Sequence, residues 1–221
     1  EFDASQLVEV IPQFHDTRNR YRQLEEAIRE DRVGRVKEVQ EEIAFIQNRK
    51  ADCFLLYDLL DEGVLPLRVT HNDTKLNNIM FDSETKEPLC IVDLDTVMPG
   101  LVLFDFGDSI RFGANDCAED EPDLSKVNFD FDLYETYVKG FIEGTNGILT
   151  EAELEYLPWG ARVITLEQGI RFLTDYINGD VYYATTRPGQ NLDRARTQLK
   201  LVQDMENVWD KMVEAVKNAQ K

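Results

Sequence analysis

The side chains best suited to chemistry lie in one short polar stretch of the sequence. His71, Asp73, Lys75 and Asn78 follow the pattern H-x-D-x-K-x-x-N. A lone Asp or Asn in such a stretch usually belongs to a solvated turn and bonds to local backbone. At this spacing, however, Asp73 can orient and deprotonate a hydroxyl, and Lys75 can neutralise charge on a phosphoryl group. Asn78 can ligate Mg²⁺ through its amide oxygen. We expect His71 to support the loop, because no second imidazole lies near it in sequence.

A second group of candidate residues, Asp93 and Asp95, follows where a β-rich run ends. Residues 78–81 and 89–94 are rich in β-forming residues and flank a polar stretch, which predicts a hairpin. The hairpin returns Asp93 to the neighbourhood of Asn78. We therefore expect Asp93 to be the main Mg²⁺ carboxylate, with Asp95 as an additional ligand or a support behind it. The whole pattern resembles the catalytic loop and metal-binding segment of protein kinases and their small-molecule relatives.

The triplet Asp105-Phe106-Gly107 has the letters of the metal-binding triplet of protein kinases. It lies 105 − 78 = 27 residues after Asn78, which is too far for the hairpin arrangement. We therefore assign the metal to Asp93 and expect Asp105 to accept backbone N–H bonds from the catalytic loop.

The sequence resembles the aminoglycoside phosphotransferase and choline kinase branch of the protein kinase-like superfamily, with N-acetylhexosamine 1-kinases as the most similar subgroup. The resemblance covers most of the chain and is carried by these segments: Phe14–Thr17, Val69–Asp82, Val92–Leu101, Asp105–Asp108 and Arg111–Asn115. It implies transfer of the γ-phosphoryl group of ATP, with Mg²⁺, directly to a sugar hydroxyl. It also implies the fold of a kinase-like C-terminal lobe.

The elements that must position these groups are mostly helical, and we expect an α+β fold with α predominant in one domain. Apolar spacing predicts a helical segment over 1–65, with a helix from Thr17, a break near 31–34 and a second helix over 36–60. A β insert over 66–114 carries the catalytic and metal-binding groups, and its first strand is 67–70.

Helices return over 127–221, after an exposed acidic loop at 115–126. One helix is expected over 132–143, and Thr150 with Glu153 forms a capping-box pattern that opens another. Pro158 predicts a kink or a helix start there. The last helix is expected to begin at about Leu192.

The first 66 residues lack the features of a nucleotide-binding lobe. They contain no glycine-rich loop, and Lys37 and Lys50 lie in helical patterns. We therefore expect this chain to be the C-terminal lobe alone, with an N-terminal nucleotide-binding lobe in the full-length protein. The lobe alone is then expected to bind nucleotide weakly and to be inactive.

The acceptor is the least determined part of the prediction. His15, Asp108, Arg111 and Arg187 are candidates to bind sugar hydroxyls or an acetamide group, and the pair Tyr182-Tyr183 could stack on a sugar ring. The formal net charge of −19 would suit a cationic acceptor, so an aminoglycoside, choline or another amino alcohol stays an alternative. An acidic helical interaction module with a degenerate kinase motif is the alternative of another class.

Composition restricts the partners and the cellular compartment that we expect for the protein. An acidic surface repels phosphate backbones and anionic lipid, which argues against nucleic acid and membranes as partners. No apolar run is long enough to cross a bilayer, and three widely spaced cysteines make neither a disulfide framework nor a zinc site. These features favour the cytoplasm.

Overall fold

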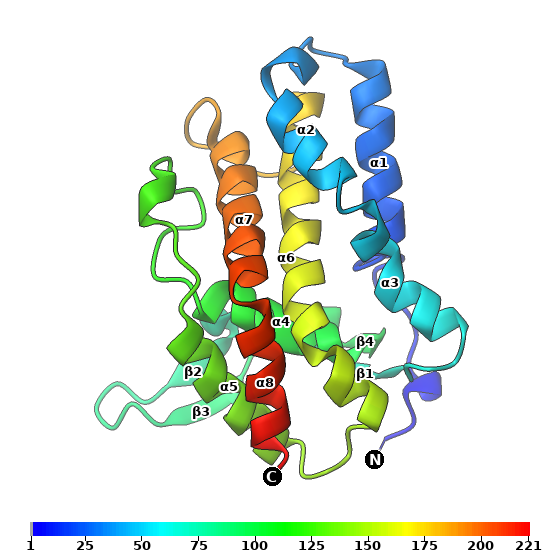
Figure 1. Ribbon diagram of the computed structural model, residues 1–221, viewed down its shortest axis with the longest axis vertical. Helices are drawn as coiled ribbons and strands as arrows, with labels where there is room; N and C mark the ends of the chain where they lie inside the picture. The colour runs from blue at the N-terminus through cyan, green and yellow to red at the C-terminus, as the bar shows by residue number, and fades with distance from the viewer. Residues whose placement is uncertain (1) are drawn as a thin grey trace.

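Helix α6 (Glu151–Asn178) is the element against which most of the chain packs. The structure is a computed structural model that describes residues 2–221, and Figure 1 shows α6 at its centre with the β segments at one end. The remaining helices are α1 (Thr17–Glu30), α2 (Gln40–Gln47), α3 (Lys50–Asp61), α4 (Val102–Gly113), α5 (Phe131–Gly144), α7 (Gln190–Asn207) and α8 (Trp209–Ala219). The fold is therefore α+β and mostly α, as the sequence predicts.

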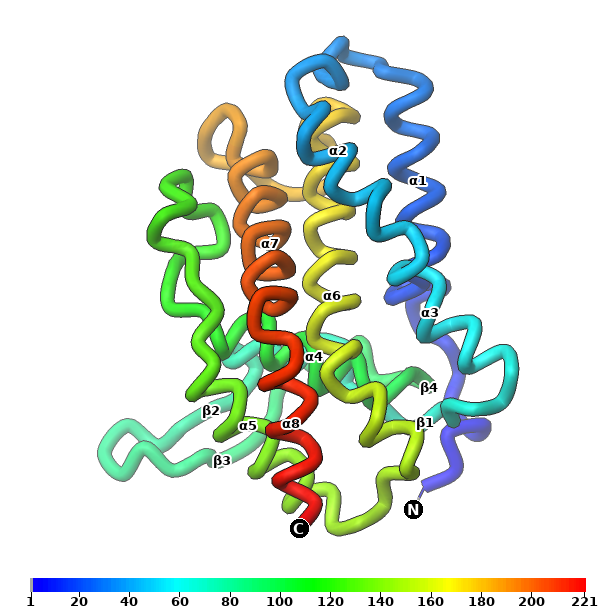
Figure 2. Tube along the Cα trace, in the orientation of Figure 1, coloured from blue at the N-terminus to red at the C-terminus, as the bar shows by residue number. Residues whose placement is uncertain are grey.

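The β part consists of two separate antiparallel pairs. Strand β1 (Arg68–Thr70) pairs with β4 (Met98–Gly100), and β2 (Ile79–Phe81) pairs with β3 (Pro88–Ile91) as a hairpin. Short 3₁₀ turns complete the chain at Ala4–Gln6, Val36–Glu38, Leu76–Asn78, Leu94–Thr96 and Leu124–Lys126. The predicted hairpin is confirmed, and the tube in Figure 2 shows it projecting from the helical body.

Helix α6 begins with the capping box that the sequence predicts. The Thr150 hydroxyl accepts a bond from the Glu153 N–H (3.1 Å), and the Glu153 carboxylate accepts one from the Thr150 N–H (2.7 Å). The helix ends at Gly179, whose φ of 98° closes it in the left-handed conformation. Pro158 lies inside the helix and does not start it. The buried Glu153 also pairs with Arg68, which ties β1 to the start of α6.

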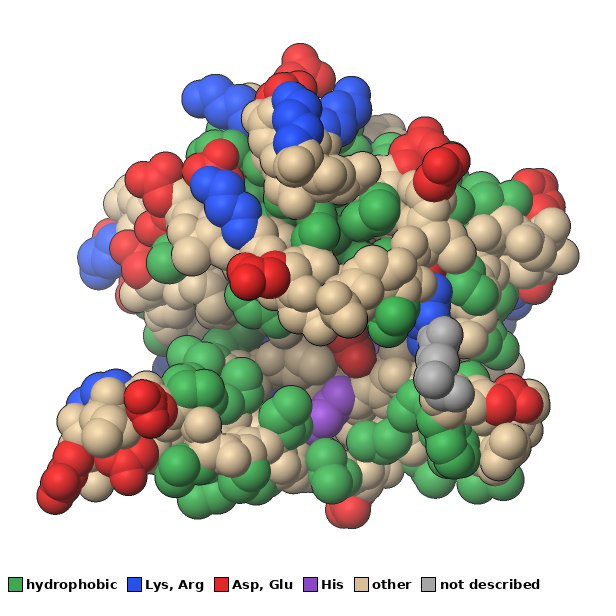
Figure 3. Space-filling view, turned by 90° about the horizontal axis from the view of Figure 1, so that it is seen from below, with side chains coloured by type: hydrophobic (Ala, Val, Ile, Leu, Met, Phe, Trp, Pro, Cys, Tyr) green, Lys and Arg blue, Asp and Glu red, His purple; other side chains and the backbone are tan. Residues whose placement is uncertain are grey.

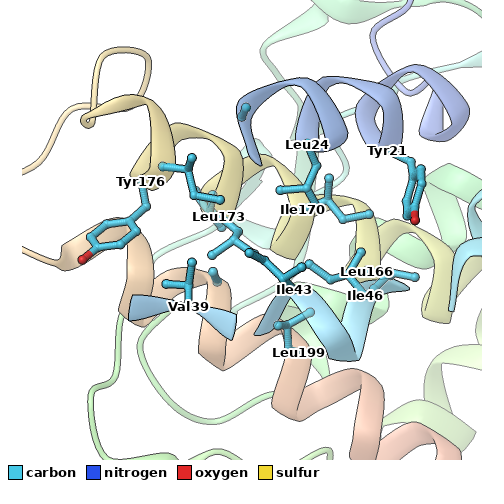
Figure 4. Packing of buried hydrophobic residues seen from close by; sticks show 14 of the residues in the cluster. Tyr21, Leu24, Val39, Ile43, Ile46, Leu166, Ile170, Leu173, Tyr176 and Leu199 are labelled. Atoms are coloured by element: carbon cyan, nitrogen blue, oxygen red, sulfur yellow. The ribbon is translucent and has the colours of Figure 1, made fainter. Parts of the chain in front are cut away.

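Three hydrophobic clusters form the core, and α6 contributes to each of them. In the first, Figure 4 shows Leu166, Ile170 and Leu173 of α6 between Leu24 of α1 and Ile43 of α2. The second joins α6 to α4, α5 and α8, and the third joins it to α3 and α4. Packing on α6 therefore fixes α4, which lies next to the predicted site. Within residues 2–221, no helix combines the length and the apolar character needed to cross a bilayer.

Two predicted helices are broken where the core requires a change of direction. The helix expected over 36–60 is divided between α2 and α3 at Asn48 and Arg49, since α2 buries Ile43 in the first cluster and α3 buries Leu56 in the third. The final helix is likewise divided at Val208. Apolar spacing alone does not reveal such breaks.

The predicted β insert over 66–114 contains a helix as well as strands. Helix α4 is not predicted from the sequence, because its polar residues Asp108 and Arg111 are buried together with its apolar ones, so polarity does not mark an exposed face. Gly107 of α4 and Gly160 of α6 meet where the two helices cross, and a Cβ on either residue would overlap backbone atoms of the other helix.

Candidate active site

Asp105 of α4 holds the loop that follows β1. Its carboxylate accepts the backbone N–H of His71 (2.8 Å) and that of Asn72 (2.7 Å), and its carbonyl accepts the Thr74 hydroxyl (2.6 Å). Burial raises the pKa of Asp105, although the two backbone N–H bonds oppose that rise. Asp105, which we do not assign to the metal, thus anchors the loop to the helical core.

His71 links the same loop to the hairpin. Its Nδ1 accepts the Asp73 N–H (3.3 Å), so Nε2 carries the proton and donates to the Val92 carbonyl (3.1 Å). The Thr96 hydroxyl donates to the His71 carbonyl (2.7 Å). Between these anchors, Asn72 adopts a left-handed backbone with φ 65°, a conformation that Asn tolerates better than most residues. Every ring nitrogen of His71 is therefore engaged in holding the loop.

Asp73, Lys75 and Asn78 are brought together. Asp73 Oδ2 accepts Lys75 Nζ (2.7 Å) and Asn78 Nδ2 (3.0 Å), and Asn78 Nδ2 also donates to the Asp73 carbonyl (2.8 Å). Lys75 therefore contacts the carboxylate directly. Both donors use Oδ2, so Oδ1 of Asp73 is left for another partner.

The base of the hairpin brings Asp93 towards Asn78. The Val92 N–H donates to the Asn78 carbonyl (2.9 Å), one step beyond the Ile79–Ile91 pair of the ladder. Asp93 is exposed and left-handed, with φ 63°, and Asp95 is exposed in the turn that follows. Within residues 2–221, no group of three or more His, Cys, Asp or Glu side chains is arranged to hold a metal. The predicted set instead combines one amide with two carboxylates.

A cavity of about 510 Å³ includes Asp73 in its wall. Three of the predicted acceptor-binding residues, His15, Asp108 and Arg111, line it. Arg187 is not among its lining residues. Arg187 instead pairs with Asp193 and Asp120, and so joins the loop before α7 to the acidic loop after α4.

The charges of this cavity do not follow the acidity of the whole chain. Its lining contains Lys75 and three arginines, against three carboxylates; these groups are Lys75, Arg111, Arg171, Arg194, Asp73, Asp108 and Glu119. Arg111 is buried and pairs with Asp108 (2.8 Å) and Glu119 (2.9 Å). Asp108 Oδ2 and Arg194 Nε are buried without a hydrogen-bond partner.

Three of these residues, Arg171, Arg194 and Glu119, are not predicted as site residues from the sequence. Arg171 and Arg194 occur in helical patterns, where a charge usually marks a solvated surface. Glu119 lies in the loop that the sequence predicts to be exposed, but it turns inwards to Arg111. Only the packing of α6 and α7 beside the catalytic loop brings them to the cavity, and no local pattern signals that arrangement.

His15 supports the cavity from the segment before α1. Its Nε2 donates to the Asn72 carbonyl (2.8 Å), and its Nδ1 lies 3.1 Å from Glu167 Oε1. Both partners are acceptors, so only the imidazolium satisfies both. Burial alone would lower the pKa of His15, but the charge of Glu167 and the two hydrogen bonds outweigh it, and the pKa rises above 6.5.

This shift predicts a pH-dependent contribution of His15 to stability. Because the folded-state pKa is raised, the contribution is complete below the unfolded value of 6.5 and is lost as pH rises through the folded-state pKa. Urea unfolding of the wild type and of His15→Gln between about pH 5.5 and 9 measures it. We expect the difference in unfolding free energy to shrink as pH rises; a constant difference would contradict the prediction.

Comparison with known families gives an independent result for the same part of the chain. A family model described as the phosphotransferase enzyme family matches residues 3–137. That span is more than half of the chain, and it includes the catalytic loop, both strand pairs and α4.

Proposed function

We propose that this chain, which belongs to the phosphotransferase enzyme family, transfers the γ-phosphoryl group of ATP to a hydroxyl of a neutral sugar. An N-acetylhexosamine is the favoured acceptor. The observation that carries this choice is the charge of the cavity beside Asp73, which has four cationic groups against three carboxylates in a chain of net charge −19.

The cavity argues against a cationic acceptor. A site for choline or an aminoglycoside needs an excess of carboxylates or a cage of aromatic rings around the cation. Here Arg111, Arg171 and Arg194 would face the cation instead. Mixed donors and acceptors, with Asp108 Oδ2 unpartnered, suit hydroxyl and acetamide groups, which donate and accept in turn.

In the proposed reaction, Asp73 is the general base. Its Oδ1 accepts the hydrogen bond of the acceptor hydroxyl, while Lys75 and Asn78 hold Oδ2. The acceptor oxygen forms a bond to the γ-phosphorus, the bond from that phosphorus to the β–γ bridging oxygen breaks, and ADP leaves. The hydroxyl proton passes to Asp73. Lys75 limits the charge that builds up around the transferring group.

The donor set near Asp73 fits Mg²⁺. Asn78 uses its amide nitrogen towards Asp73, which leaves the amide oxygen to a hard cation. Asp93 and Asp95 supply exposed carboxylates at the base of the hairpin, where the Val92 N–H bonds to the Asn78 carbonyl. These are the oxygen ligands that Mg²⁺ accepts, together with phosphate and water. When bound, Mg²⁺ would neutralise charge on the phosphate chain of ATP.

An exposed apolar face supports the proposal that a separate nucleotide-binding lobe covers the site. Figure 3 shows hydrophobic side chains spread over the face seen from below, next to the projecting hairpin. The exposed apolar residues in the strands β1 to β3 and the segments beside them are Leu67, Val69, Leu76, Met80, Phe81, Leu89, Ile91 and Leu94. Apolar patches of this kind mark interaction surfaces.

Residues 1–221 alone should therefore bind ATP weakly, and micromolar affinity by calorimetry would contradict this.

A phosphoryl-transfer screen of the full-length protein tests the proposed function. N-acetylglucosamine and glucosamine form a matched pair, because they share a ring and differ by one cationic amine. We expect kcat/KM for N-acetylglucosamine to exceed that for glucosamine, choline and aminoglycosides by about 100-fold or more, since like charges in a site are strongly unfavourable. Faster transfer to any of the cationic acceptors would overturn the choice of a neutral sugar.

A further inference from the structure

A second cavity lies directly beyond the acceptor cavity, and the two share Arg171 and Tyr183 in their walls. Its volume is about 370 Å³, within the usual range of ligand sites, ~300–1,000 Å³. It is formed by α1, the C-terminal half of α6 and the loop between α6 and α7. The Arg171 guanidinium lies 5.5 Å from the Phe14 ring, on the side of the first cavity, and 5.8 Å from the Tyr183 ring.

The second cavity gathers polar atoms that have no partner within the protein. Arg20 Nε, Thr174 Oγ1 and the Tyr183 hydroxyl are buried without a hydrogen bond, and they come from three different segments. The other nitrogens of Arg20 are occupied: Nη2 donates to the Phe14 carbonyl (2.8 Å) and Nη1 to the Gln23 side chain (3.1 Å). These bonds fix the Arg20 side chain and leave its Nε without a hydrogen-bond partner.

Such a concentration of unpaired groups points to a ligand. Buried polar atoms in folded proteins are nearly always hydrogen-bonded, and those that are not need an explanation. A ligand that both donates and accepts would satisfy a guanidinium N–H and two hydroxyl groups together. Hydroxyl groups have that property, since they can accept from the Arg20 guanidinium and donate to or accept from the two hydroxyl groups, whereas an ammonium group only donates and cannot bond to the guanidinium.

The charge and the aromatic content of the cavity agree with a neutral ligand. Three arginines and three carboxylates line it, so neither sign is in excess. Tyr182 is exposed, and its ring lies 4.8 Å from that of Tyr183 in an edge-on arrangement. The exposed ring of Tyr182 offers an apolar face to the C–H surface of a sugar ring.

We propose that the second cavity binds a further sugar ring of the acceptor, so that the preferred substrate is a disaccharide whose phosphorylated end lies beside Asp73. The proposal rests on the proposed function, because it requires a sugar in the first cavity. The shared wall of Arg171 and Tyr183 is where one ring would pass to the next. Arg20, Thr174 and Tyr183 then act as residues that determine the preferred length of the acceptor.

The test compares N-acetylglucosamine with a disaccharide that carries N-acetylglucosamine at its reducing end, using the full-length protein. We expect kcat/KM for the disaccharide to be about tenfold higher or more. Thr174→Val, which keeps the shape and removes the hydroxyl, should lower the disaccharide value about fivefold and leave the monosaccharide value unchanged. Tyr182→Ala alters an exposed residue that folding does not require. It should likewise lower kcat/KM for the disaccharide and leave the value for the monosaccharide unchanged. Thr136→Val on α5, outside both cavities, should change neither value.

The outcomes separate this inference from the proposed function. Transfer to the monosaccharide with no preference for the disaccharide would overturn the second subsite and leave the sugar kinase intact. Equal losses with both sugars in Thr174→Val and Tyr182→Ala would also overturn it, since a structural role acts on both substrates alike. No transfer to any neutral sugar, with transfer to a cationic acceptor, would overturn the proposed function itself.

Discussion

We expect Asp73→Asn in the full-length protein to lower kcat for phosphoryl transfer by about 10²–10⁴-fold, the usual contribution of a general base. The amide can still bond to the acceptor hydroxyl but cannot accept its proton at neutral pH. KM for the acceptor should therefore change much less than kcat. Lys75 loses an anionic partner, but its side chain is partly exposed and stays solvated. Steady-state kinetics with the best acceptor measure the effect.

Asp116→Asn is the matched control for this substitution. Asp116 is an exposed Asp in the loop after α4 and does not line the cavity. The same chemical change there should leave kcat and KM as in the wild type. If Asp73→Asn retained the wild-type kcat, or if both variants lost activity equally, Asp73 would not be the base. The proposed reaction would then have to be abandoned.

The second large effect is expected on stability, from Gly160→Ala. Within a helix, Ala is normally more stable than Gly by roughly 0.5–1 kcal/mol. At Gly160, however, the new Cβ would overlap the carbonyl oxygen of Leu103 in α4, and backbone cannot rotate away as a side chain can. We therefore expect the unfolding free energy to fall by about 1–3 kcal/mol, the usual cost of overpacking. Urea denaturation followed by far-ultraviolet circular dichroism, which reports the total helix content, measures it.

Gly140→Ala provides the opposite control within a helix. No atom lies within 4 Å of the Cβ position at Gly140 on α5, so this variant should be as stable as the wild type or more stable. Gly160→Ala should also reduce activity, because α4 carries Asp105 and any displacement of α4 moves the catalytic loop. If both variants were equally stable, the crossing of α4 and α6 would not be as close as described.

Local chemistry was readable from the sequence because it depends on residues close together in the chain. The H-x-D-x-K-x-x-N pattern, the hairpin after it and the capping box at Thr150 all involve neighbours, and their spacing limits the conformations available. Asp105 is not a local feature, because it lies 34 and 33 residues after His71 and Asn72, whose N–H groups it accepts; its role is predicted from the Asp-Phe-Gly triplet, whose distance from Asn78 excludes the metal. The family match over residues 3–137 includes the first two of these patterns but not the capping box.

The acceptor cavity was only partly readable because it depends on tertiary packing. Arg171 and Arg194 reach it from helices more than 90 residues after Asp73 in sequence, and each has the spacing of an ordinary surface charge. Arg187 is an equally good candidate from the sequence, but it forms ion pairs with Asp120 and Asp193 instead. Which of several equivalent arginines faces a cavity is decided by how α6, α7 and their loops pack.

The position of α6 in all three hydrophobic clusters also bears on how the protein opens. Because α6 contributes to every cluster, its amide protons should exchange with solvent only when the whole core unfolds. Strands β2 and β3 have largely exposed side chains and pair only with each other, so their amide protons should exchange through local opening at much lower free energy. The two halves of the site would then differ in protection: the loop held by Asp105 is bonded to α4, which packs against α6, whereas Asp93 lies just after a strand pair that opens locally.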